Sequence, residues 1–242
     1  MPGIVDVLTF FGRDRTRELA WGLDDLLAVL EAHGVERALT LSLRAVYYAG
    51  PQGNDETRDA CARHQVLEPV AVLDPRRWFD CREEAKRRMG EGFRVFRFFP
   101  ELQGWSVAGA NFLKICERIA ELGGRIIVSA GGAGQPTQIA RGLAEMALPT
   151  LLTGAGYSTM GEVMAVLEDY PHMHTEAHVM DTPGAIEALM QVGESQVMFG
   201  SNSPERYLES PLLMAQYADL TDAQRDACLR GNALAFLGEE RA

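Results

Sequence analysis

The stretch Asp6-Val7-Leu8-Thr9-Phe10-Phe11-Gly12 closes an apolar segment near the start of the chain, and this segment predicts a first β-strand over residues 3–10. Similar short runs of β-forming residues then alternate with helical patterns, about eight times along the chain. Such an alternation is typical of a barrel in which each parallel strand is followed by a helix. We therefore expect an α/β fold, a single (β/α)8 barrel that occupies residues 1–242 as one domain.

The boundaries of the other elements follow from the same patterns. Further strands are predicted at residues 37–44, 66–74, 93–99, 125–129, 150–154, 173–179 and 196–202. Helices are predicted near residues 20–33, 54–64, 80–90, 109–122, 136–147, 159–169, 182–192, 209–218 and 222–237.

The charge balance of the chain excludes some classes of partner. Its 242 residues include 23 Lys and Arg against 34 Asp and Glu, a formal net charge of −11. Nucleic acids and anionic membranes need a basic surface, so neither is expected as a partner. No apolar stretch approaches the ~20 residues of a membrane span, and no leader pattern is visible. With four scattered cysteines, we expect a cytoplasmic protein with free thiols.

Alternation along each strand predicts which side chains point into the barrel. In strand 37–44 we expect Leu39 and Leu41 to face the helices, which would turn Arg44 inward. In strand 93–99 we expect Phe96 and Phe98 to face outward. The inward residues expected at the C-terminal ends of the strands are Leu8, Phe10, Ser42, Arg44, Asp74, Arg97, Phe99, Ser129, Gly154, Glu176, His178 and Asn202.

Several segments resemble the amidohydrolase superfamily, specifically its amidohydrolase-2 branch of proteins similar to aminocarboxymuconate-semialdehyde decarboxylase. The opening stretch resembles the Asp-Val-His-Thr-His-Phe-Gly of that branch, and residues 198–204 resemble its Phe-Gly-Ser-Asp-x-Pro. Further resemblance lies in residues 70–75, 92–98, 151–156 and 231–238. The resemblance implies a barrel with its active site at the C-terminal ends of the strands.

In this branch the resemblance also implies a catalytic metal. Its ligands would be two histidines on the first strand, a histidine on the fifth or sixth strand, and an aspartate on the eighth that usually also transfers protons. The corresponding residues here are Leu8, Phe10, Ser129, Gly154 and Asn202. Because a divalent ion needs several nitrogen or charged oxygen ligands, we expect neither a catalytic metal nor another cofactor.

Three residues are predicted to carry the chemistry. Glu176 and His178 share one face of a strand, with side-chain roots roughly 6–7 Å apart, and could divide the roles of acid and base. Asn202 is expected to give one orienting hydrogen bond. Two alternatives stay open: a hydrogen-bonded pair that only fills the barrel, and a displaced metal site that also uses Asp74. The His172-x-His174 pair lies at the other end of its strand and is expected to be structural.

A second group is predicted to bind the substrate. Arg44 and Arg97 would hold an anion, unless Asp74 or Glu101 neutralises them. The other binding residues predicted for the pocket are Phe10, Phe99, Ser129, Tyr157 and Asp74. The aromatic residues could line the pocket or fill it. A weaker hypothesis is that the glycine-rich residues 131–134 bind a phosphate through their backbone N–H groups.

These interpretations lead to one functional hypothesis and one competitor. The first is a metal-independent enzyme of the amidohydrolase fold that acts on a small, anionic, partly aromatic or apolar carboxylate. Its reaction would be lactone hydrolysis, isomerisation, cyclisation or a lyase step. The competitor is an inactive barrel that binds a ligand or a protein. We also expect a homodimer, with an apolar patch supplied by Leu212, Leu213, Met214 and Tyr217.

Overall fold

Eight parallel strands form a closed barrel in the computed structural model, which describes residues 3–15, 20–180 and 182–239. The strands are β1 (Ile4–Arg13), β3 (Val35–Ser42), β4 (Leu67–Val72), β5 (Val95–Phe98), β6 (Arg125–Ser129), β7 (Thr150–Thr153), β8 (Met173–Glu176) and β9 (Val197–Met198). They neighbour one another in chain order. The barrel closes where the N–H of Val7 donates to the carbonyl of Phe199 at 3.0 Å. A short strand, β2 (Ala20–Trp21), pairs antiparallel with the end of β1. The predicted (β/α)8 barrel is confirmed.

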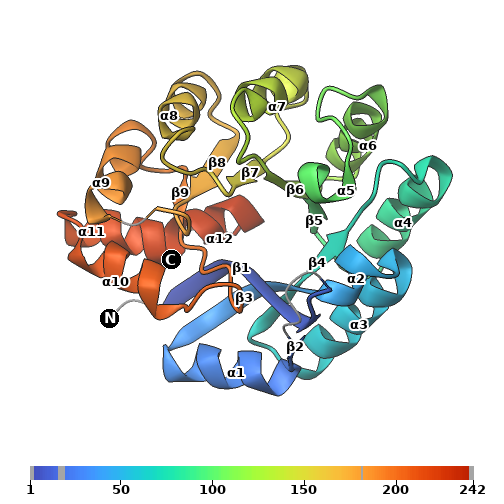
Figure 1. Ribbon diagram of the computed structural model, residues 1–242, viewed down its shortest axis with the longest axis horizontal. Helices are drawn as coiled ribbons and strands as arrows, with labels where there is room; N and C mark the ends of the chain where they lie inside the picture. The colour runs from blue at the N-terminus through green and yellow to red at the C-terminus, as the bar shows by residue number, and fades with distance from the viewer. Residues whose placement is uncertain (1–2, 16–19, 181, 240–242) are drawn as a thin grey trace.

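Helices follow the strands and encircle the barrel (Figure 1). They are α1 (Leu23–Ala32), α2 (Leu43–Tyr47), α3 (Gly50–Arg63), α4 (Trp78–Gly90), α5 (Pro100–Gln103), α6 (Ala110–Glu121), α7 (Gln135–Leu143), α8 (Met160–Asp169), α9 (Pro183–Val192), α10 (Glu209–Tyr217), α11 (Asp222–Asp226) and α12 (Asn232–Leu237). A 3₁₀ turn, η1 (Ala144–Met146), and a π-helical turn, η2 (Ala227–Gly231), complete them. The π turn divides the helix that was predicted over residues 222–237.

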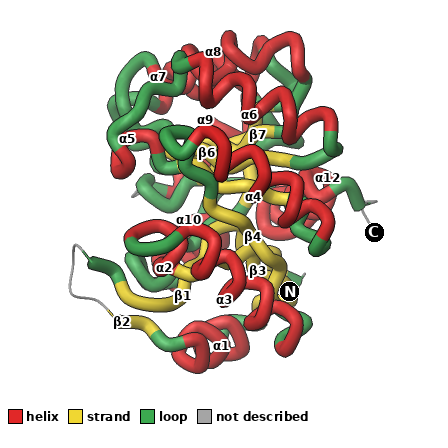
Figure 2. The backbone as a smooth tube through the Cα atoms, turned by 90° about the vertical axis from the view of Figure 1, so that its right-hand side faces the viewer, coloured by secondary structure: helices red, strands yellow, loops and turns green. Residues whose placement is uncertain are grey.

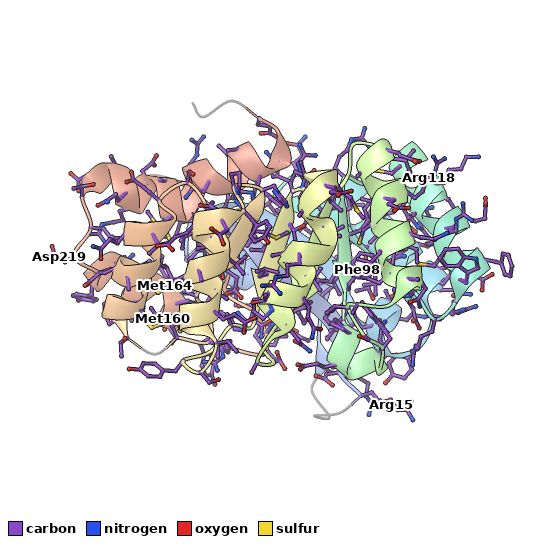
Figure 3. The ribbon with its side chains drawn as sticks, turned by 90° about the horizontal axis from the view of Figure 1, so that it is seen from above. Arg15, Phe98, Arg118, Met160, Met164 and Asp219 are labelled. Carbon is purple, nitrogen blue, oxygen red and sulfur yellow. The ribbon has the colours of Figure 1, made fainter. Side chains whose placement is uncertain are left out.

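The apolar residues form two layers, one between strands and helices and one inside the barrel. Phe98 belongs to the outer layer, where its ring packs edge-on against Phe112 at 5.2 Å. It lies inward of α6, whereas Arg118 points to the outer surface of the same helix (Figure 3). The predicted outward direction of Phe96 and Phe98 is thus confirmed.

The predicted orientation of strand β3 is wrong. Leu39 and Leu41 pack in the inner layer with Val95 and Met198, while Ala38 packs in the outer layer. Alternation separates two faces but does not say which of them is inner. Here the barrel interior is itself apolar, so the large leucines fill it.

The N-terminal end of the barrel is closed by α12, on the opposite side of the molecule from α5 and β2 (Figure 2). The Phe236 ring lies edge-on to His174 with centroids 5.2 Å apart. Asn232 donates to the carbonyls of Glu194 and Val197, both at 2.7 Å. Burial, with a smaller effect of His172, lowers the pKa of His174 to about 4, so this imidazole is neutral at neutral pH. Any open site must therefore lie at the other end.

Two predictions concern the outer surface of the protein. Of the four residues expected to form a dimer patch, Leu212 and Met214 are buried, whereas Leu213 and Tyr217 are exposed. Self-association stays a prediction that rests on these two. Among the described residues, no helix is both long enough and apolar enough to cross a membrane.

Candidate active site

A cavity of about 370 Å³ opens at the C-terminal ends of the strands. Its wall is formed by Phe10, Asp14, Leu43, Val46, Tyr47, Arg97, Phe99, Glu101, Leu102, Ser129, Thr153, Gly154, His178, Asn202, Pro204 and Glu205. Six of the predicted site residues are in this wall: Phe10, Phe99, Arg97, Ser129, His178 and Asn202. Phe10 and Phe99 line the cavity and leave it open, so the alternative in which they fill it is wrong.

Glu176 and His178 form a tight pair at the end of β8. The Nδ1 atom of His178 lies 2.7 Å from Oε2 of Glu176, and the backbone N–H of His178 donates to the same oxygen at 2.7 Å. The other oxygen accepts the N–H of Gly154 at 3.0 Å. Glu176 is completely buried behind His178, which lines the cavity. Strand alternation correctly placed both side chains on the inner face.

The electrostatics of the pair favour an ionised glutamate. Burial by itself raises the pKa of Glu176, but the nearby His178 and its hydrogen bonds outweigh burial, so the pKa is lowered. An ionised carboxylate that accepts from Nδ1–H fixes the imidazole tautomer and leaves Nε2 as the reactive atom. Nε2 makes no hydrogen bond to the described residues and is available to a ligand.

Arg97, at the end of β5, is a buried cation with hydrogen-bond donors that no described residue satisfies. It is only 4% exposed, and Nη2 donates to Oγ of Ser129 at 3.1 Å. Its Nε and Nη1 atoms are buried with no hydrogen-bond partner among the described residues. The guanidinium carbon lies 4.8 Å from the centre of the Phe99 ring, a cation–π distance. Burial lowers the pKa of Arg97 to about 9, against the opposing charges of Glu176 and Glu205, so the group stays cationic at neutral pH.

Asn202 occupies the start of the loop after β9 in a left-handed conformation with φ of 58°. Its Nδ2 donates to Oε2 of Glu205 at 2.5 Å. Asparagine tolerates this backbone conformation better than most residues. Asn202 lies in the wall of the cavity, and its amide N–H is directed to Glu205.

Three predicted binding residues lie elsewhere. Arg44 is on the exposed start of α2, where Nη1 contacts Oε1 of Glu56 at 2.7 Å, because β3 ends at Ser42 and its orientation is reversed. Asp74 pairs with Arg76 at 2.8 Å and lines a separate cavity beside α4. Tyr157 is 86% exposed and does not reach the cavity at the barrel mouth.

The glycine-rich loop after β6, whose backbone N–H groups were predicted to bind phosphate, already contacts a carboxylate. Glu162 of α8 accepts the N–H of Gly134 and the N–H of Thr137, each at 2.8 Å. A carboxylate therefore already occupies the start of α7, and a second anion there would be repelled.

Between residues 101 and 205 the cavity wall contains three polar residues that sequence reasoning did not assign to the site: Glu101, Thr153 and Glu205. Thr153 ends β7 one residue before the predicted Gly154, so alternation favoured its neighbour. Glu101 and Glu205 lie in the segments that follow β5 and β9, where strand alternation gives no direction. Both follow closely after the end of a predicted strand, and this position in the sequence could have indicated that they belong to the site.

The comparisons with known proteins agree with this architecture. The model of the amidohydrolase-2 family, described as Amidohydrolase, matches residues 18–238, so the chain belongs to this family. The matched range begins after β1 and does not include the opening stretch with Leu8 and Phe10. None of the curated proteins matches the chain.

Solved structures with low sequence identity share the fold over nearly the whole chain. The 2,6-dihydroxybenzoate decarboxylase from Rhizobium has a TM-score of 0.75 and 14% identity, over 98% of this chain and 99% of that one. The 5-carboxyvanillate decarboxylase from Novosphingobium aromaticivorans, solved with manganese, has a TM-score of 0.77 and 13% identity, over 98% and 97%. A probable 2-pyrone-4,6-dicarboxylic acid hydrolase from Acinetobacter baumannii, solved with citric acid, has a TM-score of 0.75 and 12% identity, over 98% and 99%.

The residues of this chain do not fit a manganese ion of the kind seen in one of these structures. Leu8 and Phe10 on β1 have no donor atom in their side chains. The amide of Asn202 is turned to Glu205, and Glu176 is already held by His178 and Gly154. In residues 3–15, 20–180 and 182–239, no three His, Cys, Asp or Glu side chains are grouped so that they could hold a metal.

Proposed function

We propose that this protein is an enzyme that binds a small, partly aromatic or apolar carboxylate and acts on it by acid–base chemistry without a metal ion. The observation that carries the proposal is Arg97. A buried cation with two unsatisfied donors is costly unless an anion pairs with it. A carboxylate is planar and would accept from Nη1 and Nη2 together, or from Nε and Nη2 together, in the two-pronged geometries that guanidinium groups favour. Either arrangement gives a partner to one of the two unsatisfied donors of Arg97.

The cavity suits the rest of such a ligand. Phe10, Phe99 and Leu43 give it an apolar wall, and small-molecule sites combine such walls with a few polar groups. The three structural relatives named above act on, or were solved with, compounds that carry carboxylate groups. These relatives support the substrate class but not a particular substrate.

The pair of Glu176 and His178 would transfer the proton. The Glu176 carboxylate orients the ring through Nδ1, so Nε2 can accept a proton from the ligand or deliver one to it. Lactone hydrolysis, isomerisation, cyclisation and decarboxylation each need such a transfer. Asn202 contributes Oδ1 as an acceptor, while its Nδ2 positions Glu205.

The competing hypothesis is a barrel that binds a ligand but catalyses nothing. In that case the Glu176–His178 pair only fills the barrel interior, and its loss affects stability alone. Both hypotheses predict carboxylate binding at Arg97, so turnover separates them.

Isothermal titration of chelator-treated protein with benzoate, 3-phenylpropanoate and citrate tests the binding site. Arg97→Gln should weaken binding by roughly 2–5 kcal/mol, about 30- to 4,000-fold, because it removes a buried charge pair. Arg44→Gln is the matched control, since Arg44 lies outside the cavity beside Glu56. Carboxylates that bind Arg97→Gln and the wild type equally well would contradict the proposal.

A further inference from the structure

A second charge lies on the same wall of the cavity as Arg97. Glu101, on the short helix α5, lines the cavity four residues after Arg97. Arg97 contacts Ser129 at the end of β6, whereas the Glu101 carboxylate lies over Gly132 in the loop that follows β6. Glu101 is therefore above Arg97 on the β5–β6 side, at the exposed rim of the cavity.

The two opposite charges do not pair with each other. Among the residues that the structure describes, Arg97 donates only to Ser129, and the charges that act on it are those of Glu176 and Glu205. The Glu101 carboxylate has no ion pair and no hydrogen bond to any described residue. One cavity thus presents a buried cation with unused donors and a rim anion with unused acceptors.

Neighbouring residues set the backbone before the rim carboxylate and leave space beside it. Pro100 occupies the first turn of α5 and fixes the backbone directly before Glu101. A Cβ atom at position 132 would lie 3.0 Å from Oε1 of Glu101, a close contact that the glycine avoids. Two further carboxylates, those of Asp14 and Glu205, line the same cavity, so an anionic group at this level would meet like charge.

We infer that the substrate carries a positively charged amine in addition to its carboxylate, with the carboxylate on Arg97 and the ammonium group on Glu101. This inference rests on the proposed function, because it assumes that Arg97 holds a carboxylate. A ligand with only a carboxylate would satisfy the buried cation and leave the rim anion without a partner. A ligand with a carboxylate, an ammonium group and an apolar body matches the buried cation, the rim anion and the apolar side chains of the cavity wall.

Matched pairs of ligands test the inference at three charge spacings. The pairs are L-phenylalanine with 3-phenylpropanoate, 3-(aminomethyl)benzoate with 3-methylbenzoate, and 4-(aminomethyl)benzoate with 4-methylbenzoate. Titrations are made at about pH 7, where the amines are protonated. In at least one pair the amine-bearing compound should bind about two- to fivefold more tightly, as expected for one exposed ion pair.

The variants separate this inference from the proposed function. In Glu101→Gln, the amine-bearing compound should bind about as tightly as its amine-free partner. The affinity for the amine-free compound should not change. Glu145→Gln, an exposed glutamate on η1, is the control and should keep the advantage. Equal or weaker binding of the amine-bearing compound in all three pairs, or an advantage that survives in Glu101→Gln, would overturn the inference. In either case, amine-free carboxylates that depend on Arg97 would still uphold the proposed function. Failure of all six compounds to bind would overturn both.

Discussion

The two ends of the barrel treat buried titratable groups in opposite ways. At the closed end, α12 covers His174, and burial keeps this imidazole neutral by lowering its pKa to about 4. At the open end, the imidazole of His178 lines a cavity and contacts a buried glutamate whose pKa is lowered. The closed end removes charge from the interior, whereas the open end retains charge and holds it in a defined place.

The unsatisfied polar atoms at the two ends also differ in meaning. At the closed end, Nδ1 of His174 and Nε2 of His172 have no hydrogen-bond partner among the described residues, but the pKa of both rings is lowered, so no charge is buried there. At the open end, the unsatisfied atoms belong to Arg97, which is cationic. A buried cation with unsatisfied donors is more costly than a neutral ring, which is why we propose that Arg97 binds an anion.

The largest expected difference between the ends concerns turnover. His178→Ala should lower turnover about 10²–10⁴-fold, because it removes the group that transfers the proton. It should also lower the melting temperature, because the buried Glu176 carboxylate loses its charge partner. His174→Ala should leave turnover unchanged and lower the melting temperature. The turnover of a carboxylate that the wild type converts, and the thermal unfolding of both variants, check this prediction. A His178→Ala protein that is destabilised but has no loss of turnover would favour the inactive barrel.

The closed end should matter for stability alone. Phe236→Ala removes a buried ring that packs against His174 and should lower the free energy of unfolding by roughly 3–5 kcal/mol. Phe79→Ala is the control, since Phe79 is 80% exposed and its loss should change stability by less than about 0.5 kcal/mol. Denaturant unfolding measures both. Weakened carboxylate binding in Phe236→Ala, measured on protein that is still folded, would show that the ends are coupled.

Acid should destabilise the protein through the closed end. In the unfolded chain His174 takes up a proton near pH 6.5, but in the folded protein only near pH 4, so the unfolded state binds more protons in between. Falling pH across this window should cost about 3 kcal/mol of stability at most. Asp6 acts in the opposite direction, because burial raises its pKa to about 6 and its contribution is lost as pH rises. His174→Gln should therefore be less sensitive to acid than the wild type; equal sensitivity would contradict the assignment.

The smallest expected effect is that of metal removal. Because the residues at the open end do not fit a divalent ion, chelation should change neither carboxylate affinity nor melting temperature. Elemental analysis of the purified protein should find no stoichiometric Zn, Mn or Fe. About one equivalent of a transition metal per chain would contradict this prediction.

Strands β5 and β3 show what the sequence could and could not predict. In β5, Phe96 and Phe98 pack in the outer layer, so alternation correctly directed Arg97 inward. In β3, leucines alternate with small residues, and either face could have been the inner one. The choice depends on how closely the neighbouring helices pack, which the local sequence does not contain. Arg44 was misassigned for this reason.

The site was predictable where it lies on strands and not where it lies on the segments after them. Glu176 and His178 were found from period-two alternation along β8. Glu101 and Glu205 were missed because their directions are set by α5 and by the turn at Asn202. A strand was predicted over residues 173–179, but β8 ends at Glu176. The chain therefore turns after Glu176, and His178 contacts the Glu176 carboxylate.

A crystal structure of the protein soaked with 3-phenylpropanoate tests the central claim most directly. We predict the carboxylate on the guanidinium of Arg97, with Nη1 or Nε as one of its donors at about 2.7–2.9 Å, with the phenyl ring against Phe10 or Phe99 and no metal between them. The same soak of Arg97→Gln should show an empty cavity. A carboxylate held by a metal ion, or bound away from Arg97 in the wild type, would contradict the account.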